Sequence, residues 1–311
     1  MAHTLRIELV QRAFMSARLG ILLMLYEITS KVVDDRFAFI PTEKCVEILQ
    51  GVLARAQEKF PLVDVYAFHF LSNHLHLLIG APTLAHKSAF LEWTLREISK
   101  RINQLLGRSG SLLEQNHCIQ ITTEEHALQR LQYIMGQATA QFLVRHPADD
   151  IFASSTPFLL FGKPVEGVFS YAGQDPKTLT VRIDRLPGLE ALSSKDHRAL
   201  MWQLADDVAS QARPKRKKAG VRIPDPEALR RLDPMTKPRV RDRSPAPVVH
   251  GPPEHHQEWR EAQEALREAY SRATRAFHAW QADPTQLMIP WPPHTLPPAF
   301  ARPRGPRAGA A

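Results

Sequence analysis

The stretch VDVYAFHFLSNHLHLLIG, residues 63–80, decides the fold. Two apolar runs of strand length lie on either side of Ser72 and Asn73, residue types that favour a tight turn. The stretch therefore predicts a β-hairpin. Side chains alternate along a strand, so His74 and His76 project from one face, and the apolar positions between and after them face a core.

The patterns that flank this hairpin predict an α+β domain. The predicted elements are, in order, a strand at 20–29, a helix at 43–60, the two hairpin strands, a helix at 88–106, a strand at 117–121 and a helix from 122 to about 144. Thr42 stands where it can cap the first helix, and Thr122 with Glu125 forms a capping-box pattern for the last. This order favours a ferredoxin-like antiparallel sheet with flanking helices.

Composition suggests how the rest of the chain is organised. We expect one domain over residues 15–158 and an accessory segment over 159–212 that includes a helix near its end. The run RPKRKK opens a basic, proline-rich linker over 213–253. A helix rich in Glu, Ala and Arg follows at 254–283, and the proline-rich residues 284–311 form a disordered tail.

The overall charge favours a polyanionic partner. The chain has 311 residues, a net charge of +8 and a pI near 9.6, a balance that favours nucleic acid, although basic proteins without such a partner are common. The two cysteines, Cys45 and Cys118, lie far apart, which argues against a zinc knuckle or a disulfide framework and suits the cytoplasm. The apolar run at 19–26 is too short to span a membrane, so no membrane attachment is expected.

Four side chains could combine into a reactive site. A His-x-His pair alone is a weak signal, since core histidines also produce it. Tyr133 and Gln137, within LQYIMGQ, lie four residues apart on one side of the last predicted helix, away from its apolar stripe. Together with His74 and His76, the Gln137 amide oxygen could hold a cation that polarises a phosphodiester, and Tyr133 could attack the phosphate.

These residues resemble a known family. The sequence His74-Leu75-His76 is similar to the HUH motif, and FLSNHLHLLI is similar to the corresponding stretch of single-tyrosine HUH transposases, including REP-associated tyrosine transposases. YIMGQ resembles their tyrosine helix, and ITSKVVDDRFAF resembles their first strand and turn. The resemblance covers residues 20–160. The chain departs from the pattern at Glu27, where the family often has a histidine, and within LLEQNH and ATAQ.

The resemblance implies a specific reaction. Tyr133 would be the catalytic nucleophile in cleavage and rejoining of single-stranded, hairpin-associated DNA through a 5′-phosphotyrosine intermediate. His74, His76 and Gln137 would bind Mg²⁺ or Mn²⁺. The family also implies a homodimer.

Basic residues supply candidates for contacts with DNA phosphates. These candidates are Lys87, Arg96, Lys100, Arg101 and Arg108 along one predicted helix, and Lys215, Arg216, Lys217 and Lys218 in the basic run. The alternative for both groups is a solvated, charged surface. Two other functions remain open: a domesticated, catalytically inactive protein that binds hairpin DNA, and an unrelated metal hydrolase that uses His74 and His76.

Overall fold

The computed structural model describes residues 13–171, 174–236 and 254–292. These residues belong to two compact units. One unit contains the sheet, and its described residues end at 236. The other unit contains the C-terminal helix.

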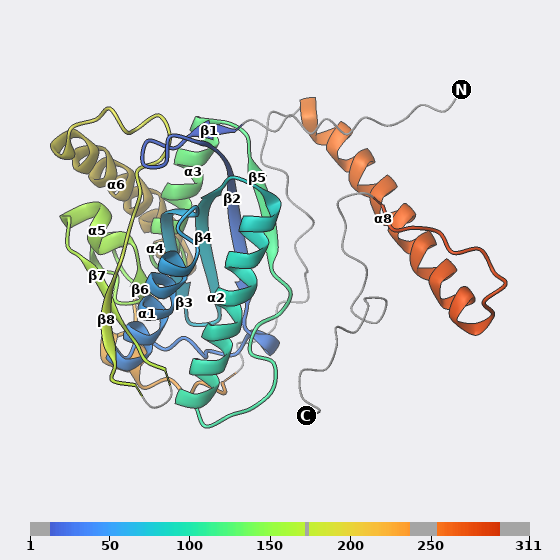
Figure 1. Cartoon of the computed structure of the whole chain (residues 1–311). Helices are drawn as coiled ribbons and strands as arrows, with labels where there is room; N and C mark the ends of the chain where they lie inside the picture. Colours follow the sequence, from blue (N-terminus) through green and yellow to red (C-terminus); the bar gives the residue numbers. More distant parts are fainter. Residues whose placement is uncertain (1–12, 172–173, 237–253, 293–311) are drawn as a thin grey trace. The chain divides into compact units, whose positions relative to one another are not determined.

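The central sheet has the strand order of a ferredoxin-like fold (Figure 1). Its strands are β1 (Phe14–Met15), β2 (Leu22–Lys31), β3 (Asp64–Leu71), β4 (His74–Ala81), β5 (His117–Ile121) and β6 (Ala153–Ser154). The four main strands lie in the order β5-β2-β4-β3, and every pairing is antiparallel. β1 pairs with β2, and β6 pairs with β3. The predicted α+β class with an antiparallel ferredoxin-like sheet is confirmed.

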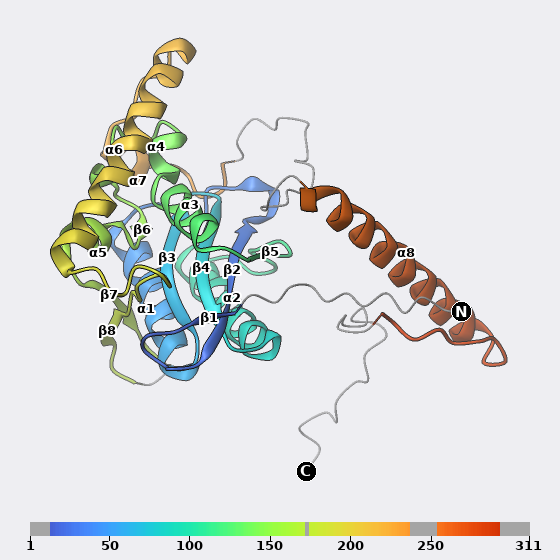
Figure 2. The same ribbon diagram turned by 90° about the horizontal axis from the view of Figure 1, so that it is seen from above.

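Helices cover both faces of this sheet (Figure 2). They are α1 (Glu43–Lys59), α2 (Leu84–Leu105), α3 (Glu124–Met135), α4 (Gln137–Ala140), α5 (Thr156–Phe161), α6 (Ser194–Ala219) and α7 (Pro226–Arg230), with short 3-10 turns at Val33–Asp35 and Pro147–Asp149. α1 and α2 pack on one face, where Leu75, Leu77 and Ile79 are fully buried. α3 and α4 lie across the other face.

The helix starts follow from capping side chains. The Thr42 hydroxyl accepts a hydrogen bond from the Cys45 amide, as predicted for the first helix. α2 begins four residues before the predicted start, because Thr83 caps it. The predicted capping box at the start of α3 is wrong by one residue: Thr123 is the cap and accepts from the His126 amide, so Glu125 does not occupy the third helical position.

The last helix of the domain is shorter than the sequence predicts. α3 ends at Met135, Gly136 separates it from α4, and Phe142 turns the chain with a φ of 59°. A Cβ at Gly136 would stand 2.8 Å from a Val208 methyl group on α6. The close approach of α6 explains why a residue without a side chain stands at position 136. The helical pattern of residues 122–144 alone could not predict this contact with α6.

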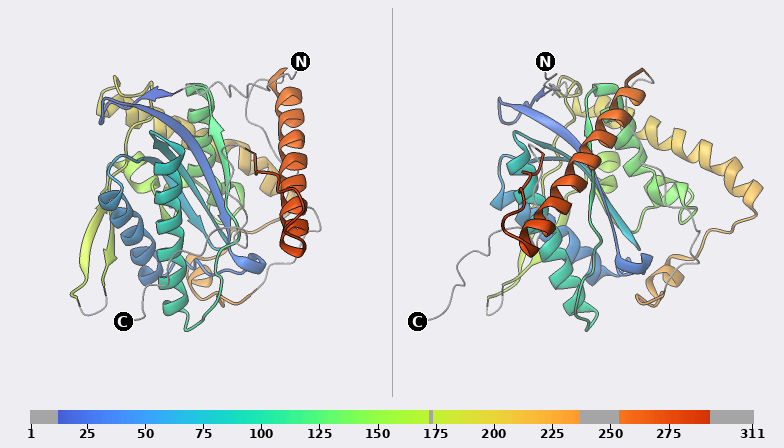
Figure 3. Two further views of the ribbon diagram at one scale, coloured as in Figure 1. Left: turned by 45° about the vertical axis from the view of Figure 1, so that its right-hand side comes forward. Right: turned by 90° about the vertical axis from the view of Figure 1, so that its right-hand side faces the viewer.

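The segment expected to be accessory belongs to the same core. β7 (Val165–Phe169) and β8 (Lys177–Val181) form a hairpin that packs on α1 (Figure 3). Gly51 and Gly167 allow this contact, since a Cβ on either would overlap the other segment's backbone. Phe169 and Met201 are buried with the sheet residues, so the boundary expected at 158/159 is wrong.

The basic run is helical. α6 continues through Pro214 to Ala219 and ends at Gly220, whose φ is 63°. Residues 213–219 are therefore the end of a helix, and the expectation that a linker starts at 213 is wrong. Residues 237–253 of that expected linker lie outside the described residues.

The second unit contains α8 (Glu254–Ala282). Residues 283–292 follow it, and the Trp291 indole donates a hydrogen bond to the Thr274 hydroxyl, while its ring centroid lies 5.3 Å from that of Phe277. The start of the expected tail is therefore packed on α8, and residues 293–311 lie outside the described residues. Within the described parts of both units, every helix is too short or too polar to cross a membrane.

Candidate active site

A row of polar side chains crosses the sheet face that α3 covers. The β2–β4 register pairs Thr29 with His76, and the β3–β4 register pairs His69 with His76. Directly paired residues share a face, so the three side chains lie side by side. His74 and Glu27 follow on the same face, two residues along their own strands.

Each histidine of the His-x-His pair uses its Nδ1 atom within the protein. His76 Nδ1 lies 3.1 Å from the Thr29 hydroxyl and 3.6 Å from a Glu27 carboxylate oxygen. His74 Nδ1 lies 2.7 Å from the Asn73 side-chain oxygen. The two ring centroids are 5.0 Å apart. These contacts orient both rings, and His76 Nε2 is buried with no hydrogen-bond partner among the described residues.

The environment keeps both imidazoles neutral. Burial lowers the pKa of His74 to about 3, the neighbouring charges of His76 and His69 act in the same direction, and hydrogen bonding by Gln137 opposes them. Burial also lowers the pKa of His76, against the attraction of Glu27. A neutral imidazole has the lone pair that metal coordination requires.

The tyrosine helix lies against these histidines. The Tyr133 ring centroid is 5.3 Å from that of His76, and the ring planes meet at 88°. The Arg130 guanidinium lies 4.0 Å from the centre of the Tyr133 ring and donates a hydrogen bond of 2.6 Å to Glu27. Tyr133 is 44% exposed, so its ring contacts the buried site and also meets solvent.

Glu27 joins the histidine and the arginine. Its side chain is almost fully buried in the middle of β2. Burial opposes ionisation, but hydrogen bonds from His76 and Arg130, together with their charges, outweigh it and lower the Glu27 pKa. The carboxylate is therefore charged at neutral pH and fixes the positions of both neighbours.

Gln137 reaches the same place from α4. Its side chain is 2% exposed, in contrast to the outward position that the helical pattern predicted. Its amide nitrogen donates to the Tyr133 carbonyl oxygen at 3.2 Å, which leaves the amide oxygen as the remaining acceptor. The Gln137 side chain also opposes the lowering of the His74 pKa, so it lies close to that imidazole. The break at Gly136 turns Gln137 toward the sheet while Tyr133 stays at the surface.

The donor set suits a divalent cation only if the amide takes part. No group of three or more His, Cys, Asp or Glu side chains that could hold a metal occurs within the described ranges. His74, His76 and Gln137 together offer two imidazole nitrogens and one amide oxygen. The unpartnered, buried His76 Nε2 and the carboxylate behind the His76 ring are features of histidines that bind metals. The residues present therefore fit a bound cation.

The basic residues expected on α2 lie away from this site. α2 carries Lys87, Arg96, Lys100 and Arg101 and covers the opposite sheet face from Tyr133. Arg108 lies beyond the end of α2 and donates a hydrogen bond to the Ser111 carbonyl oxygen. Lys87 lies 4.8 Å from the Tyr26 ring centre, and Arg101 lies 3.8 Å from that of Phe169 and pairs with Glu97. Two of the five thus pack within the protein.

The basic residues of the RPKRKK run divide into two groups. Arg216 lines a pocket beside α4 together with Arg213, the first residue of the run. Lys215, Lys217 and Lys218 are exposed near the end of α6 and are not among the residues that line this pocket.

Sequence reasoning missed three participants in the site. Glu27 was noted only as a departure from a family pattern, although a carboxylate within an apolar strand is itself a signal of a buried partner. Arg130 carried no signal, because only the fold brings it to Glu27. His69 lies next to His76 across the β3–β4 pairing, where its Nδ1 is 3.1 Å from the Ile134 carbonyl oxygen and its Nε2 is 3.3 Å from the buried Asp150.

Comparisons with known proteins give similarities at the level of solved structures. No family model and no curated protein matches the chain. A REP-associated tyrosine transposase bound to a REP hairpin matches 42% of this chain and 76% of its own, with 16% identity and a TM-score of 0.36. A protein from Deinococcus radiodurans R1 that is described as a transposase matches 37% of this chain and 91% of its own, with 16% identity and a TM-score of 0.29. At these values, neither similarity assigns a function to this chain.

Proposed function

We propose that this chain is a metal-dependent enzyme that cleaves and rejoins single-stranded DNA, with Tyr133 as the nucleophile. One observation carries the proposal: Tyr133 stands against His76 at a site where two neutral imidazoles and the Gln137 amide converge. Such a convergence joins a nucleophile to a set of cation ligands. The net charge of +8 favours a polyanionic substrate.

The reaction would exchange one phosphodiester for another. The Tyr133 oxygen forms a bond to phosphorus as the bond from phosphorus to the 3′ oxygen breaks. The phenol loses its proton, and the departing 3′ oxygen takes one up. The products are a 5′-phosphotyrosine and a free 3′-hydroxyl. Attack by a 3′-hydroxyl on the phosphotyrosine reverses these changes and joins a strand, so no nucleotide cofactor is consumed.

The surrounding residues have separate parts in this proposal. His74, His76 and Gln137 would hold Mg²⁺ or Mn²⁺, and the cation would polarise the phosphate and offset charge that develops on its oxygens. Glu27 positions His76 through Nδ1. Arg130 places a positive charge over the face of the Tyr133 ring, and this cation–π contact helps to hold the ring in place.

A covalent adduct is the direct test. The protein is incubated with single-stranded hairpin DNA and Mn²⁺, and the products are separated under denaturing conditions. We expect a protein–DNA adduct that Tyr133→Phe abolishes. Tyr171→Phe is the matched control, because Tyr171 is also 44% exposed and lies on the β7–β8 hairpin. An adduct that persists in Tyr133→Phe would exclude this tyrosine as the nucleophile.

The inactive DNA-binding protein gives a different result in the same experiment. It predicts no adduct in the unaltered chain, with salt-sensitive DNA binding that neither His74→Ala nor Tyr133→Phe changes. Hairpin preference and a homodimer are further parts of the proposal. They are tested by comparing hairpin with unstructured strands and by sedimentation of the protein with and without DNA.

A further inference from the structure

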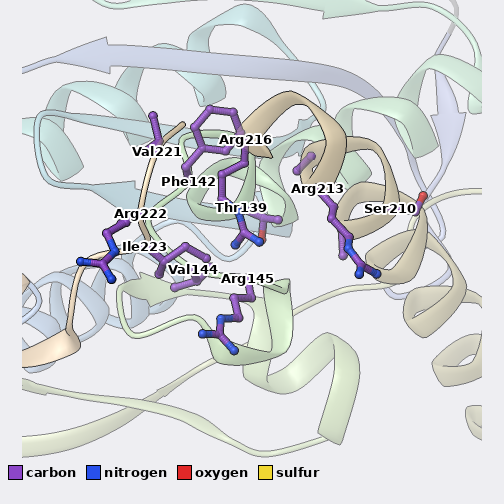
Figure 4. A pocket seen from close by; sticks show the side chains of 12 residues that line it. Thr139, Phe142, Val144, Arg145, Ser210, Arg213, Arg216, Val221, Arg222 and Ile223 are labelled. Carbon is purple, nitrogen blue, oxygen red and sulfur yellow. The ribbon is translucent and has the colours of Figure 1, made fainter. Parts of the chain in front are cut away.

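A basic pocket lies beside the candidate active site, between α4, the end of α6 and the segment that follows α6 (Figure 4). Its volume is about 650 Å³, within the range of roughly 300–1,000 Å³ that is common for sites of small ligands. Six of its lining residues carry the argument: Thr139, Phe142, Arg145, Arg213, Arg216 and Arg222.

The charge of this pocket has one sign. Four arginines line it, and no aspartate or glutamate does. In the part of the chain that the structure describes, none of the four guanidinium groups forms an ion pair or a hydrogen bond within the protein. Figure 4 shows their side chains around one opening. Unpaired guanidinium groups around one opening suit phosphate, which a guanidinium can bind through two parallel hydrogen bonds.

Two uncharged side chains complete the pocket. Phe142 has a φ of 59°, a left-handed conformation that bulky residues rarely adopt, and this turn puts its ring in the pocket lining. Thr139 is 1% exposed, and its hydroxyl oxygen has no hydrogen-bond partner among the described residues. The pocket thus offers an aromatic face and an unused polar group beside its positive charges.

The position of the pocket connects it to Tyr133. Thr139 lies two residues after Gln137 in the four-residue helix α4. One end of α4 thus supplies an amide to the histidines, and the other lines the pocket. A DNA strand bound at Tyr133 would need only a short path to reach the arginines.

We propose that this pocket holds one nucleotide of the single-stranded DNA that is bound at Tyr133. The arginines bind its phosphate, and Phe142 stacks on its base. This inference rests on the proposed function for the identity of the strand. The occupant is part of a DNA chain and is neither free phosphate nor a free nucleotide.

The test compares two double variants of the same helix. Arg213→Gln/Arg216→Gln removes two charges that line the pocket, and Lys215→Gln/Lys217→Gln removes two charges nearby that do not. Binding of a fluorescent single strand is measured in EDTA, so that metal-dependent cleavage does not occur. We expect the arginine variant to bind about tenfold more weakly than the lysine variant. Its slope of log affinity against log salt should fall by about 0.7, the value for one phosphate contact on a single strand.

A third variant tests the base. Phe142→Leu should weaken strand binding by roughly 5- to 150-fold, the range for loss of one stacked base. Phe161→Leu is the control, since Phe161 is an exposed aromatic on α5. Circular dichroism establishes that each variant is folded. Unchanged binding in Phe142→Leu would overturn the stacking.

The remaining outcomes separate the two proposals. Equal losses in the arginine and lysine variants would overturn the pocket, because charge alone would then explain binding. Inorganic phosphate and a mononucleotide are also tested as competitors of the fluorescent strand. If either competes as strongly as an unlabelled strand does, the occupant of the pocket is not part of a DNA chain. If binding depends on the arginines but no Tyr133 adduct forms, the proposed cleavage reaction is wrong and the pocket proposal stands. If the adduct forms but the arginine variant binds DNA as well as the unaltered chain does, the pocket proposal is wrong and the proposed reaction stands.

Discussion

The imidazole of His76 and the phenol of Tyr133 meet edge to face, with ring centroids 5.3 Å apart. His76 belongs to the rigid centre of the sheet, and Tyr133 belongs to the last turn of α3. The arrangement brings a partly exposed side chain against a buried imidazole. The two residues have different roles in the proposed site: His76 is a cation ligand, whereas Tyr133 contacts His76 and is not a ligand.

Replacing Glu27 with glutamine should weaken cation binding although Glu27 is not a ligand. The carboxylate orients His76 through Nδ1, and loss of such a partner usually costs about 10- to 100-fold in metal affinity. Titration calorimetry with Mn²⁺ measures the change. Tyr133→Phe is the control and should stay within about twofold of the unaltered chain, because it removes no ligand. An undiminished affinity in Glu27→Gln would mean that the carboxylate does not position His76.

Arg130 should contribute to stability through the same carboxylate. Arg130→Met leaves the buried Glu27 without its closest cation, and breaking a buried pair in this way costs about 3 kcal/mol of unfolding free energy. Glu27→Gln/Arg130→Met should recover part of that loss, because no buried charge remains. Urea denaturation of the single and double variants measures the coupling. Additive losses would show that the two side chains act independently.

The metal-free protein should lose stability as the pH falls below about 6.5. Burial lowers the pKa of His74, His76 and His197, so the unfolded chain binds protons in a range where the folded chain does not. The free energy of unfolding therefore decreases toward acid, by at most about 1.4 kcal/mol per pH unit for each histidine.

Denaturation in EDTA at several pH values between 7 and 5 checks this sign. His197→Gln, which lies away from the candidate site, should flatten the dependence, and replacement of the exposed His117 is the control. A stability that rises toward pH 5 would contradict the lowered pKa values.

Gly51→Ala should destabilise the fold, even though alanine favours helices more than glycine does. The added methyl group would overlap the backbone of Val168, so β7 must move away from α1. Overpacking of this kind costs about 1–3 kcal/mol, and thermal unfolding monitored by circular dichroism measures it. Glu58→Ala, on the exposed side of α1, should change the stability by less than about 0.5 kcal/mol.

The sequence allowed prediction of features that depend on local patterns. The fourth strand of the ferredoxin-like unit, at residues 117–121, has the predicted bounds, and Thr42 caps α1 as expected. Alternation along β4 placed the histidines and the buried leucines on opposite faces. These features depend on residues within one element, whose spacing can be read directly.

Features that depend on contacts between distant segments were missed. The end of α3 at Met135 depends on Val208, more than 70 residues later in the chain, and the link from Glu27 to Arg130 crosses from β2 to α3. Pro214 suggested a linker, yet α6 passes through it. The burial of Gln137 follows from the break between α3 and α4 at Gly136. The residues of the candidate site could therefore be predicted from the sequence, but their arrangement in space could not.

The contact between Gly136 and Val208 also limits how far this chain can be truncated. α6 packs where α3 ends, so it supports the position of Tyr133 as well as lining the pocket. The ferredoxin-like unit by itself would lack that support. A fragment that keeps the tyrosine in its native position should therefore extend at least through Val208.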